Sequence, residues 1–157
     1  AIAYTRAHAK EWQLDPNKIG VIGFSAGAFT AALASNNYNK VAYPPIDSYD
    51  ELNLRPDFTI LVYPAFLEGE NFSIVPELTL TENTPPTLLI QAQTDYDYLN
   101  SSLFYYYALK EAKVSVTMYL YPKGGHGFGV RNTGYLINEW PERAISWMKE
   151  VRVLKKW

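Results

Sequence analysis

The residues Gly23-Phe24-Ser25-Ala26-Gly27 form a G-x-S-x-G pattern between a short apolar run and a stretch of small residues. The apolar run, Ile19-Gly20-Val21-Ile22, is typical of a strand, and the residues from Ala26 onward extend over a helical length without a proline. In this layout a strand enters a sharp turn that lifts a serine hydroxyl above the edge of a sheet. The pattern therefore predicts a nucleophile at Ser25.

Both glycines of the pattern have a steric explanation. A strand and a helix cross closely on either side of such a turn, so we expect that no side chain fits at Gly23 or Gly27. The helix also points its first amides, beginning with that of Ala26, at the place where negative charge develops on a reacting carbonyl. We therefore expect the Ala26 amide to be one donor of an oxyanion hole.

Strand-like and helix-like segments alternate along the whole chain. We expect strands at residues 19–24, 58–63, 87–93 and 114–121, and helices at residues 1–13, 26–35, 101–112 and 141–151. The segments between them, among them a Gly-rich stretch at residues 123–135, are expected to be loops. This alternation predicts an α/β fold in which a mostly parallel sheet is covered by helices on both faces.

The composition narrows the class of protein. The chain has 157 residues, 48% of them hydrophobic and 19% charged, which suits a single globular domain over residues 1–157. A net charge of -2 argues against nucleic acid or an anionic membrane as a partner, and no apolar run approaches membrane-spanning length. Because the chain has no cysteine, it has neither a disulfide framework nor a Cys-ligated metal site.

A serine hydroxyl becomes an effective nucleophile only when a base takes its proton. The chain offers two histidines. His8 lies among charged residues of the first expected helix, where a solvated surface position is the simplest interpretation. His126 lies in the Gly-rich loop directly after the last expected strand, and its flanking glycines allow the imidazole to reach over the edge of the sheet. We therefore expect His126 to be the base.

The third group of such a site orients the imidazole and stabilises its protonated form. Asp95 follows the expected strand at residues 87–93 and would lie on the same edge of the sheet as Ser25 and His126. Asp97 competes for this role, since it lies only two residues further on. The order serine, aspartate, histidine is that of the α/β-hydrolases and differs from the orders of the trypsin-type and subtilisin-type proteases.

Several stretches carry a resemblance to a known family, namely Asp15 to Gly27, Arg55 to Phe58, Val62 to Pro64, Pro85 to Asp95, Tyr121 to Gly129 and Trp140-Pro141. Over nearly the whole chain they resemble bacterial α/β-hydrolase esterases of the group that holds acetyl-xylan and related carbohydrate esterases. The resemblance implies the α/β-hydrolase fold, with Ser25 as nucleophile, Asp95 as acid, His126 as base and no metal or cofactor. Where the family often has Asp-Asp-Pro followed by Val, this chain has Thr94-Asp95-Tyr96-Asp97-Tyr98, which keeps Asp97 as an alternative acid.

Members of this family also carry an earlier half with a His-Gly-Gly-type loop, and no such segment precedes Ser25. The resemblance thus implies the C-terminal part of the fold without the N-terminal strands, as expected for a fragment of a longer esterase. We expect the strand at residues 19–24 to be an exposed edge that favours self-association or pairing with a missing N-terminal half. The second oxyanion-hole donor would then come from outside this chain.

These features predict a serine esterase that deacylates a small ester or an acylated carbohydrate such as acetylated xylan. Aromatic residues near the expected site, namely Tyr96, Tyr98, Phe128 and Trp140, could stack on sugar rings. Two alternatives remain open at this point. One is a fragment of a prolyl-oligopeptidase-type serine peptidase, which shares the order of the triad and the Gly-rich histidine loop. The other is a truncated hydrolase that binds ligands without catalysis.

Overall fold

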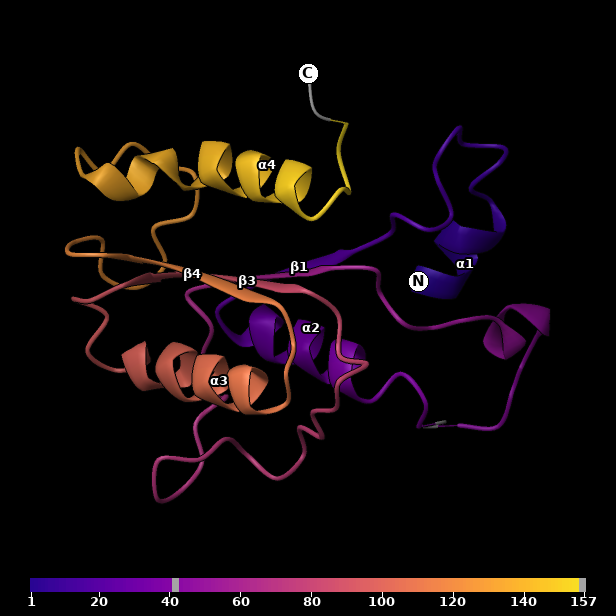
Figure 1. Ribbon diagram of the computed structural model, residues 1–157, viewed down its shortest axis with the longest axis horizontal. Coiled ribbons are helices and arrows are strands. Elements are labelled where there is room, and N and C mark those ends of the chain that lie inside the picture. Colours follow the sequence, from indigo (N-terminus) through magenta and orange to yellow (C-terminus); the bar gives the residue numbers. More distant parts are fainter. Residues whose placement is uncertain (41–42, 156–157) are drawn as a thin grey trace.

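The computed structural model describes residues 1–40 and 43–155 (Figure 1). Its elements in chain order are α1 (Ile2–Ala7), β1 (Val21–Phe24), α2 (Ala26–Asn36), the 3-10 helix η1 (Ser48–Glu51), β2 (Thr59–Val62), β3 (Thr87–Ala92), α3 (Leu99–Glu111), β4 (Val116–Tyr121), the 3-10 helix η2 (Leu136–Glu139) and α4 (Trp140–Glu150). The longest helix, α3, has 13 residues, and within the described ranges no helix is long and apolar enough to cross a bilayer.

The four strands form one parallel sheet in the order β1-β2-β3-β4. Helices α2 and α3 cover one face of this sheet and α4 covers the other (Figure 1). The sheet and its two helical layers confirm the predicted α/β architecture. Among the described strands β1 lies at one end of the sheet with a neighbour on one side only, as expected for the strand that precedes Ser25.

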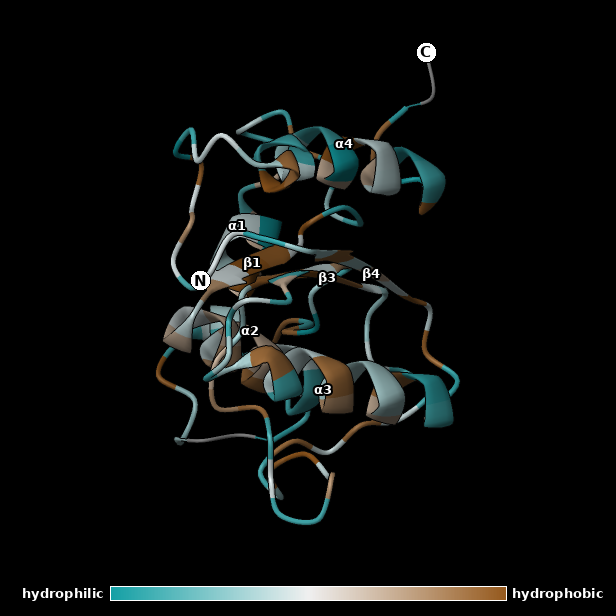
Figure 2. Ribbon diagram, turned by 90° about the vertical axis from the view of Figure 1, so that its left-hand side faces the viewer, coloured by the Kyte–Doolittle hydropathy of each residue, from teal (hydrophilic) through white to brown (hydrophobic). Residues whose placement is uncertain are grey.

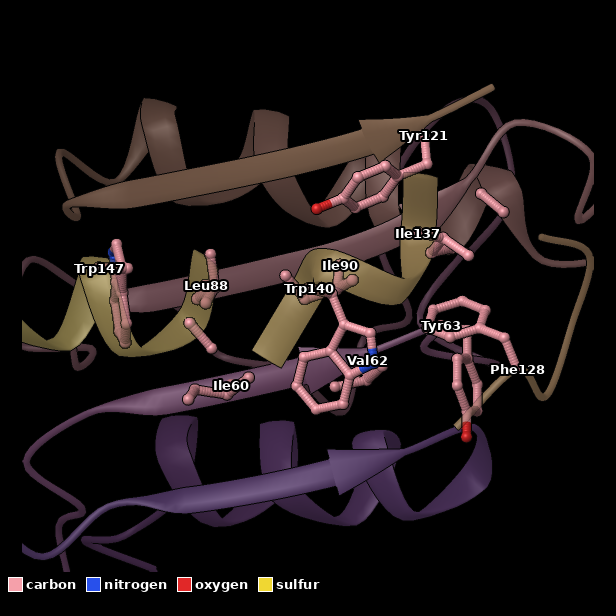
Figure 3. Close-up of a cluster of buried hydrophobic side chains, with 12 residues drawn as sticks. Ile60, Val62, Tyr63, Leu88, Ile90, Tyr121, Phe128, Ile137, Trp140 and Trp147 are labelled. Carbon is pink, nitrogen blue, oxygen red and sulfur yellow. The ribbon is translucent and has the colours of Figure 1, made fainter. Parts of the chain in front are cut away.

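Alternating side chains of the central strands build a separate core on each face of the sheet. Ile60 and Val62 of β2 pack toward α4, where Trp147 is fully buried (Figure 3). Leu61, which lies between them in sequence, packs on the opposite face against Ala28 and other residues of α2 and α3. Successive residues of a strand point to opposite faces, so a continuous apolar run is what a strand covered on both sides requires. In Figure 2, β1 is also coloured as hydrophobic, although Ile22 and Phe24 of this strand are exposed.

The prediction of one helix over residues 1–13 is wrong beyond Ala7. Residues 8–13 form turns instead, and the φ of Gln13, 56°, lies in the left-handed region. Tertiary contacts explain the difference, because the Arg6 guanidinium reaches across to the Asp57 carboxylate at 3.2 Å and donates to the Pro16 carbonyl at 2.8 Å. These contacts fold residues 8–16 back toward the sheet, which a straight helix would not allow.

Candidate active site

Ser25 occupies a sharp turn between β1 and α2. Its φ of 52° and ψ of -125° lie outside the regions that a residue with a side chain normally adopts. Two backbone hydrogen bonds hold this strained conformation: the Ser25 amide donates to the Val62 carbonyl at 3.1 Å, and the Ala65 amide donates to the Ser25 carbonyl at 3.3 Å. Strained residues persist where the surrounding structure fixes them, and they concentrate at active sites. The turn thus presents the Ser25 hydroxyl at the C-terminal edge of the sheet.

The steric explanation holds for one of the two glycines in the G-x-S-x-G pattern. A Cβ atom added to Gly23 would lie 2.4 Å from the Gly27 carbonyl oxygen and 2.6 Å from the Ala28 Cα. A Cβ atom added to Gly27 would meet nothing within 4 Å, so the expectation that Gly27 is required by crowding is wrong. The close crossing of strand and helix is concentrated at Gly23, because β1 faces the start of α2 there.

We expect Gly23→Ala to lower the free energy of unfolding by about 2 kcal/mol, since its Cβ would collide with backbone atoms that cannot turn aside. The matched variant Gly27→Ala adds the same methyl group in open space at the start of α2. There it is expected to be neutral or to stabilise the fold by up to about 1 kcal/mol. Urea unfolding of both variants measures the difference. Equal stability of the two variants would contradict the proposed crowding at Gly23.

His126 reaches the same edge of the sheet from the loop that follows β4. The residues on either side of it, Gly125 and Gly127, have φ values of 66° and 73°, which glycine adopts without strain. The Gly125 amide donates to the Thr94 hydroxyl at 3.1 Å, which ties this loop to the loop after β3. The Trp140 indole N–H donates to the Gly129 carbonyl at 2.7 Å and anchors the loop to α4. The imidazole is therefore carried by a loop that is fixed at both ends.

A continuous chain of hydrogen bonds joins Ser25, His126 and Asp95. The Ser25 Oγ lies 2.7 Å from His126 Nε2, and His126 Nδ1 lies 2.7 Å from Asp95 Oδ2. Asp95 is 2% exposed, whereas Asp97 is exposed to solvent. With its Nδ1–H donated to a carboxylate, the imidazole keeps Nε2 free to accept the hydroxyl proton. The structure thus brings together the three side chains that the sequence singles out, and it places Asp95 rather than Asp97 against the imidazole.

Two tyrosine rings contact the imidazole, which stays partly exposed to solvent. The Tyr63 ring lies 5.1 Å from the His126 ring in an edge-on arrangement, and the Tyr98 ring lies 4.8 Å from it. Tyr63 packs in turn on Phe128 at 4.5 Å (Figure 3). Burial raises the pKa of the Tyr63 hydroxyl, so this ring stays neutral beside the imidazole at physiological pH. Tyr63 directly follows β2 and precedes Pro64. This position after a strand is the one signal in the sequence for its contact with the site.

Of the other residues considered for the site, His8 lies apart from the triad, and Phe128 and Trp140 lie inside the core. His8 donates its Nδ1–H to the Tyr4 carbonyl at 2.9 Å and stacks on Trp12, away from Ser25. Phe128 and Trp140 are buried, so the expectation that they offer ring faces to a sugar is wrong. Their rings fill the core between the sheet and α4. Of the four aromatic residues considered for sugar stacking, Tyr96 is exposed and Tyr98 is half-buried.

Ala26 is the first residue of α2 and directly follows Ser25. Amides in the first turn of a helix have no partner within the helix, and the helix dipole is positive at this end. An acyl carbonyl bound to Ser25 Oγ would therefore meet a ready donor at the Ala26 amide. This position is suited to stabilising an oxyanion.

The sequence profile of the prolyl oligopeptidase family matches residues 1–153. An acetylxylan esterase from Xylanibacter ruminicola is 27% identical over 177 residues, which cover 96% of this chain and 34% of that protein. This chain therefore spans about a third of the length of that curated relative.

Solved structures show the same architecture. An acetyl ester-xyloside bifunctional hydrolase from Caldicellulosiruptor lactoaceticus superposes with a TM-score of 0.84 at 27% identity, over 98% of this chain and 64% of that one. An α/β hydrolase named MGS-M1, from a deep-sea metagenome library, superposes with a TM-score of 0.75 at 25% identity, over 98% of this chain and 62% of that one. These similarities confirm the α/β-hydrolase fold, of which this chain covers a part, and the predicted resemblance to carbohydrate esterases.

Proposed function

We propose that this chain, which belongs to the prolyl oligopeptidase family, forms the triad-bearing part of a serine esterase. The proposed substrates of this esterase are acetylated xylan or related acylated sugars. The observation that carries this proposal is the pair of 2.7 Å contacts from Ser25 Oγ to His126 Nε2 and from His126 Nδ1 to Asp95 Oδ2. The names of two relatives, an acetylxylan esterase and an acetyl ester-xyloside hydrolase, support the choice of substrate.

The geometry supports a two-step acyl transfer. His126 Nε2 takes the proton of Ser25 Oγ as this oxygen attacks the ester carbonyl, and the Ala26 amide donates to the resulting oxyanion. The intermediate collapses, and the sugar hydroxyl leaves with the proton from His126. Water then attacks the acyl-serine with His126 again as base, which releases the acid and restores Ser25. The Asp95 carboxylate accepts the Nδ1–H of His126 and stabilises the imidazolium.

A second candidate is a serine peptidase activity, which the name of the matching family favours. The same triad attacks an amide carbonyl by the same steps, with an amine as the leaving group. The two candidates differ in the substrate that the surrounding residues accept. The similarity to an acetylxylan esterase and to an acetyl ester-xyloside bifunctional hydrolase, each at 27% identity, favours the ester.

Hydrolysis of an acetylated xylo-oligosaccharide and of a chromogenic proline-containing peptide amide, measured side by side, tests this proposal. We expect slow acetate release from the oligosaccharide, monitored by NMR, because Ala26 supplies one oxyanion donor and the second is expected from outside this chain. We expect no cleavage of the peptide. Ser25→Ala serves as the control for contaminating activity. Peptide cleavage without acetate release would support the peptidase. Failure to hydrolyse either substrate would support a binding role without catalysis and contradict the proposal.

A further inference from the structure

Phe66 lies beside the nucleophile with much of its ring exposed. It follows Ala65, whose amide donates to the Ser25 carbonyl at 3.3 Å, so its backbone is fixed next to the strand-to-helix turn. The side chain is 54% exposed although it is a large apolar group. Its φ of 65° lies in the left-handed region, which a bulky residue rarely adopts. Strained residues of this kind concentrate at ligand sites, where the surrounding structure holds them in place.

Tyr98 joins Phe66 to the triad. The two rings lie 5.4 Å apart and meet edge to face, and the Tyr98 ring lies 4.8 Å from the imidazole of His126. The Gln91 side-chain amide donates to the Tyr98 carbonyl at 3.2 Å, and this bond holds the start of α3 against β3. Phe66 and Tyr98 therefore form a continuous aromatic wall that begins at the imidazole and extends outward to solvent. We name this pair the Phe66–Tyr98 wall.

A second phenylalanine shows that exposure and backbone strain alone do not make such a wall. Phe72 has a φ of 59° and is 83% exposed, so it matches Phe66 in both respects. Its ring, however, packs edge to face on Phe104 of α3 at 5.5 Å. Of these two phenylalanines, Phe66 is the one that is connected through Tyr98 to His126. This connection to the imidazole, rather than its chemical type, distinguishes Phe66 from Phe72.

Building on the proposed esterase function, we propose that the Phe66–Tyr98 wall binds the sugar ring whose hydroxyl carries the ester. The C–H face of a pyranose is flat and apolar, and it gains from contact with an exposed aromatic ring. The hydroxyl groups at the rim of the sugar stay in water, which fits a wall that is half exposed rather than a closed pocket. Stacking on Phe66 would hold the sugar while its ester carbonyl reaches Ser25 Oγ.

Binding of an acetylated methyl xyloside to the Ser25→Ala variant, measured by NMR titration, tests this inference without hydrolysis. We expect Phe66→Ala in this background to raise Kd roughly two- to tenfold, as loss of one aromatic contact does. Phe66→Tyr is expected to keep the affinity. The matched change Phe72→Ala is expected to leave Kd unaltered, and thermal unfolding checks that each variant is folded. Equal affinity of Phe66→Ala and its parent, or no binding by the parent, would overturn the proposed sugar site.

A separate assay keeps the outcome for the wall apart from that for the esterase function. The chain with Ser25 intact is given ethyl acetate, which has no ring to stack. Hydrolysis of this ester together with an unchanged Kd in Phe66→Ala would retain the esterase and remove the sugar site. Binding that depends on Phe66, without hydrolysis of any ester, would retain the sugar site and remove the esterase function.

Discussion

Ser25→Ala and His126→Ala are each expected to lower kcat for ester hydrolysis by about 10³-fold or more, with little further loss in the double variant. The physical reason is that the two groups act as one unit, since His126 Nε2 lies 2.7 Å from the oxygen whose proton it must take. Once either group is removed, the other has no role in the attack. Initial rates on an acetylated xylo-oligosaccharide, with saturating substrate, measure the effect.

The chain contains a matched control for the histidine. His8 is the second of its two histidines and lies in an aromatic cluster with Tyr4, Trp12 and Tyr49, outside the site. We expect His8→Ala to retain the kcat of the parent within about twofold, because no step of the reaction involves His8. Equal rates for His126→Ala and the parent would refute the assignment of His126 as the base. Losses that multiply in the double variant would show that the two groups act independently.

Asp95→Asn is expected to lower kcat by about 10⁴-fold. An asparagine amide at this position would donate to Nδ1, which favours the imidazole tautomer that carries its proton on Nε2, and this tautomer cannot accept the proton of Ser25. The structure supports this expectation because Asp95 Oδ2 lies 2.7 Å from Nδ1 and the side chain is shielded from solvent.

Asp97→Asn supplies the matched control for this change. Asp97 lies two residues away in the same loop and is exposed, so its neutralisation is expected to change kcat by about twofold at most. Rates and far-UV circular dichroism of both variants separate a catalytic loss from an unfolded chain. A larger loss in Asp97→Asn than in Asp95→Asn would contradict the geometry of the triad.

The sheet could be predicted closely from the sequence because its strands are short apolar runs with clear limits. Residues 87–93 follow Pro85-Pro86 and lead to Asp95, and the structure has β3 at Thr87–Ala92. The N-terminal helix could not be predicted in the same way. Its length is decided by Arg6, which contacts Asp57 far along the chain, and no local pattern contains that contact.

The candidate site shows the same division. Ser25 and His126 follow from motifs in which glycines flank the functional residue, so the sequence alone singles them out. The choice between Asp95 and Asp97 depends on the turn after β3, where the Asp95 amide donates to the Ala92 carbonyl at 3.1 Å and directs the Asp95 side chain inward. The contacts of Tyr63 and Tyr98 with the imidazole, and that of Phe66 with Tyr98, join separate loops and required the structure.

Labelling with a fluorophosphonate, followed by mass spectrometry of the digested chain, tests most directly the assignment of Ser25 as the nucleophile. The reagent forms a covalent bond to a serine oxygen only where a base activates that oxygen. We predict a single adduct on Ser25 that is strongly reduced in His126→Ala and unchanged in His8→Ala. An adduct on another residue, or no adduct on the folded chain, would contradict the account of Ser25 and His126 as an activated pair.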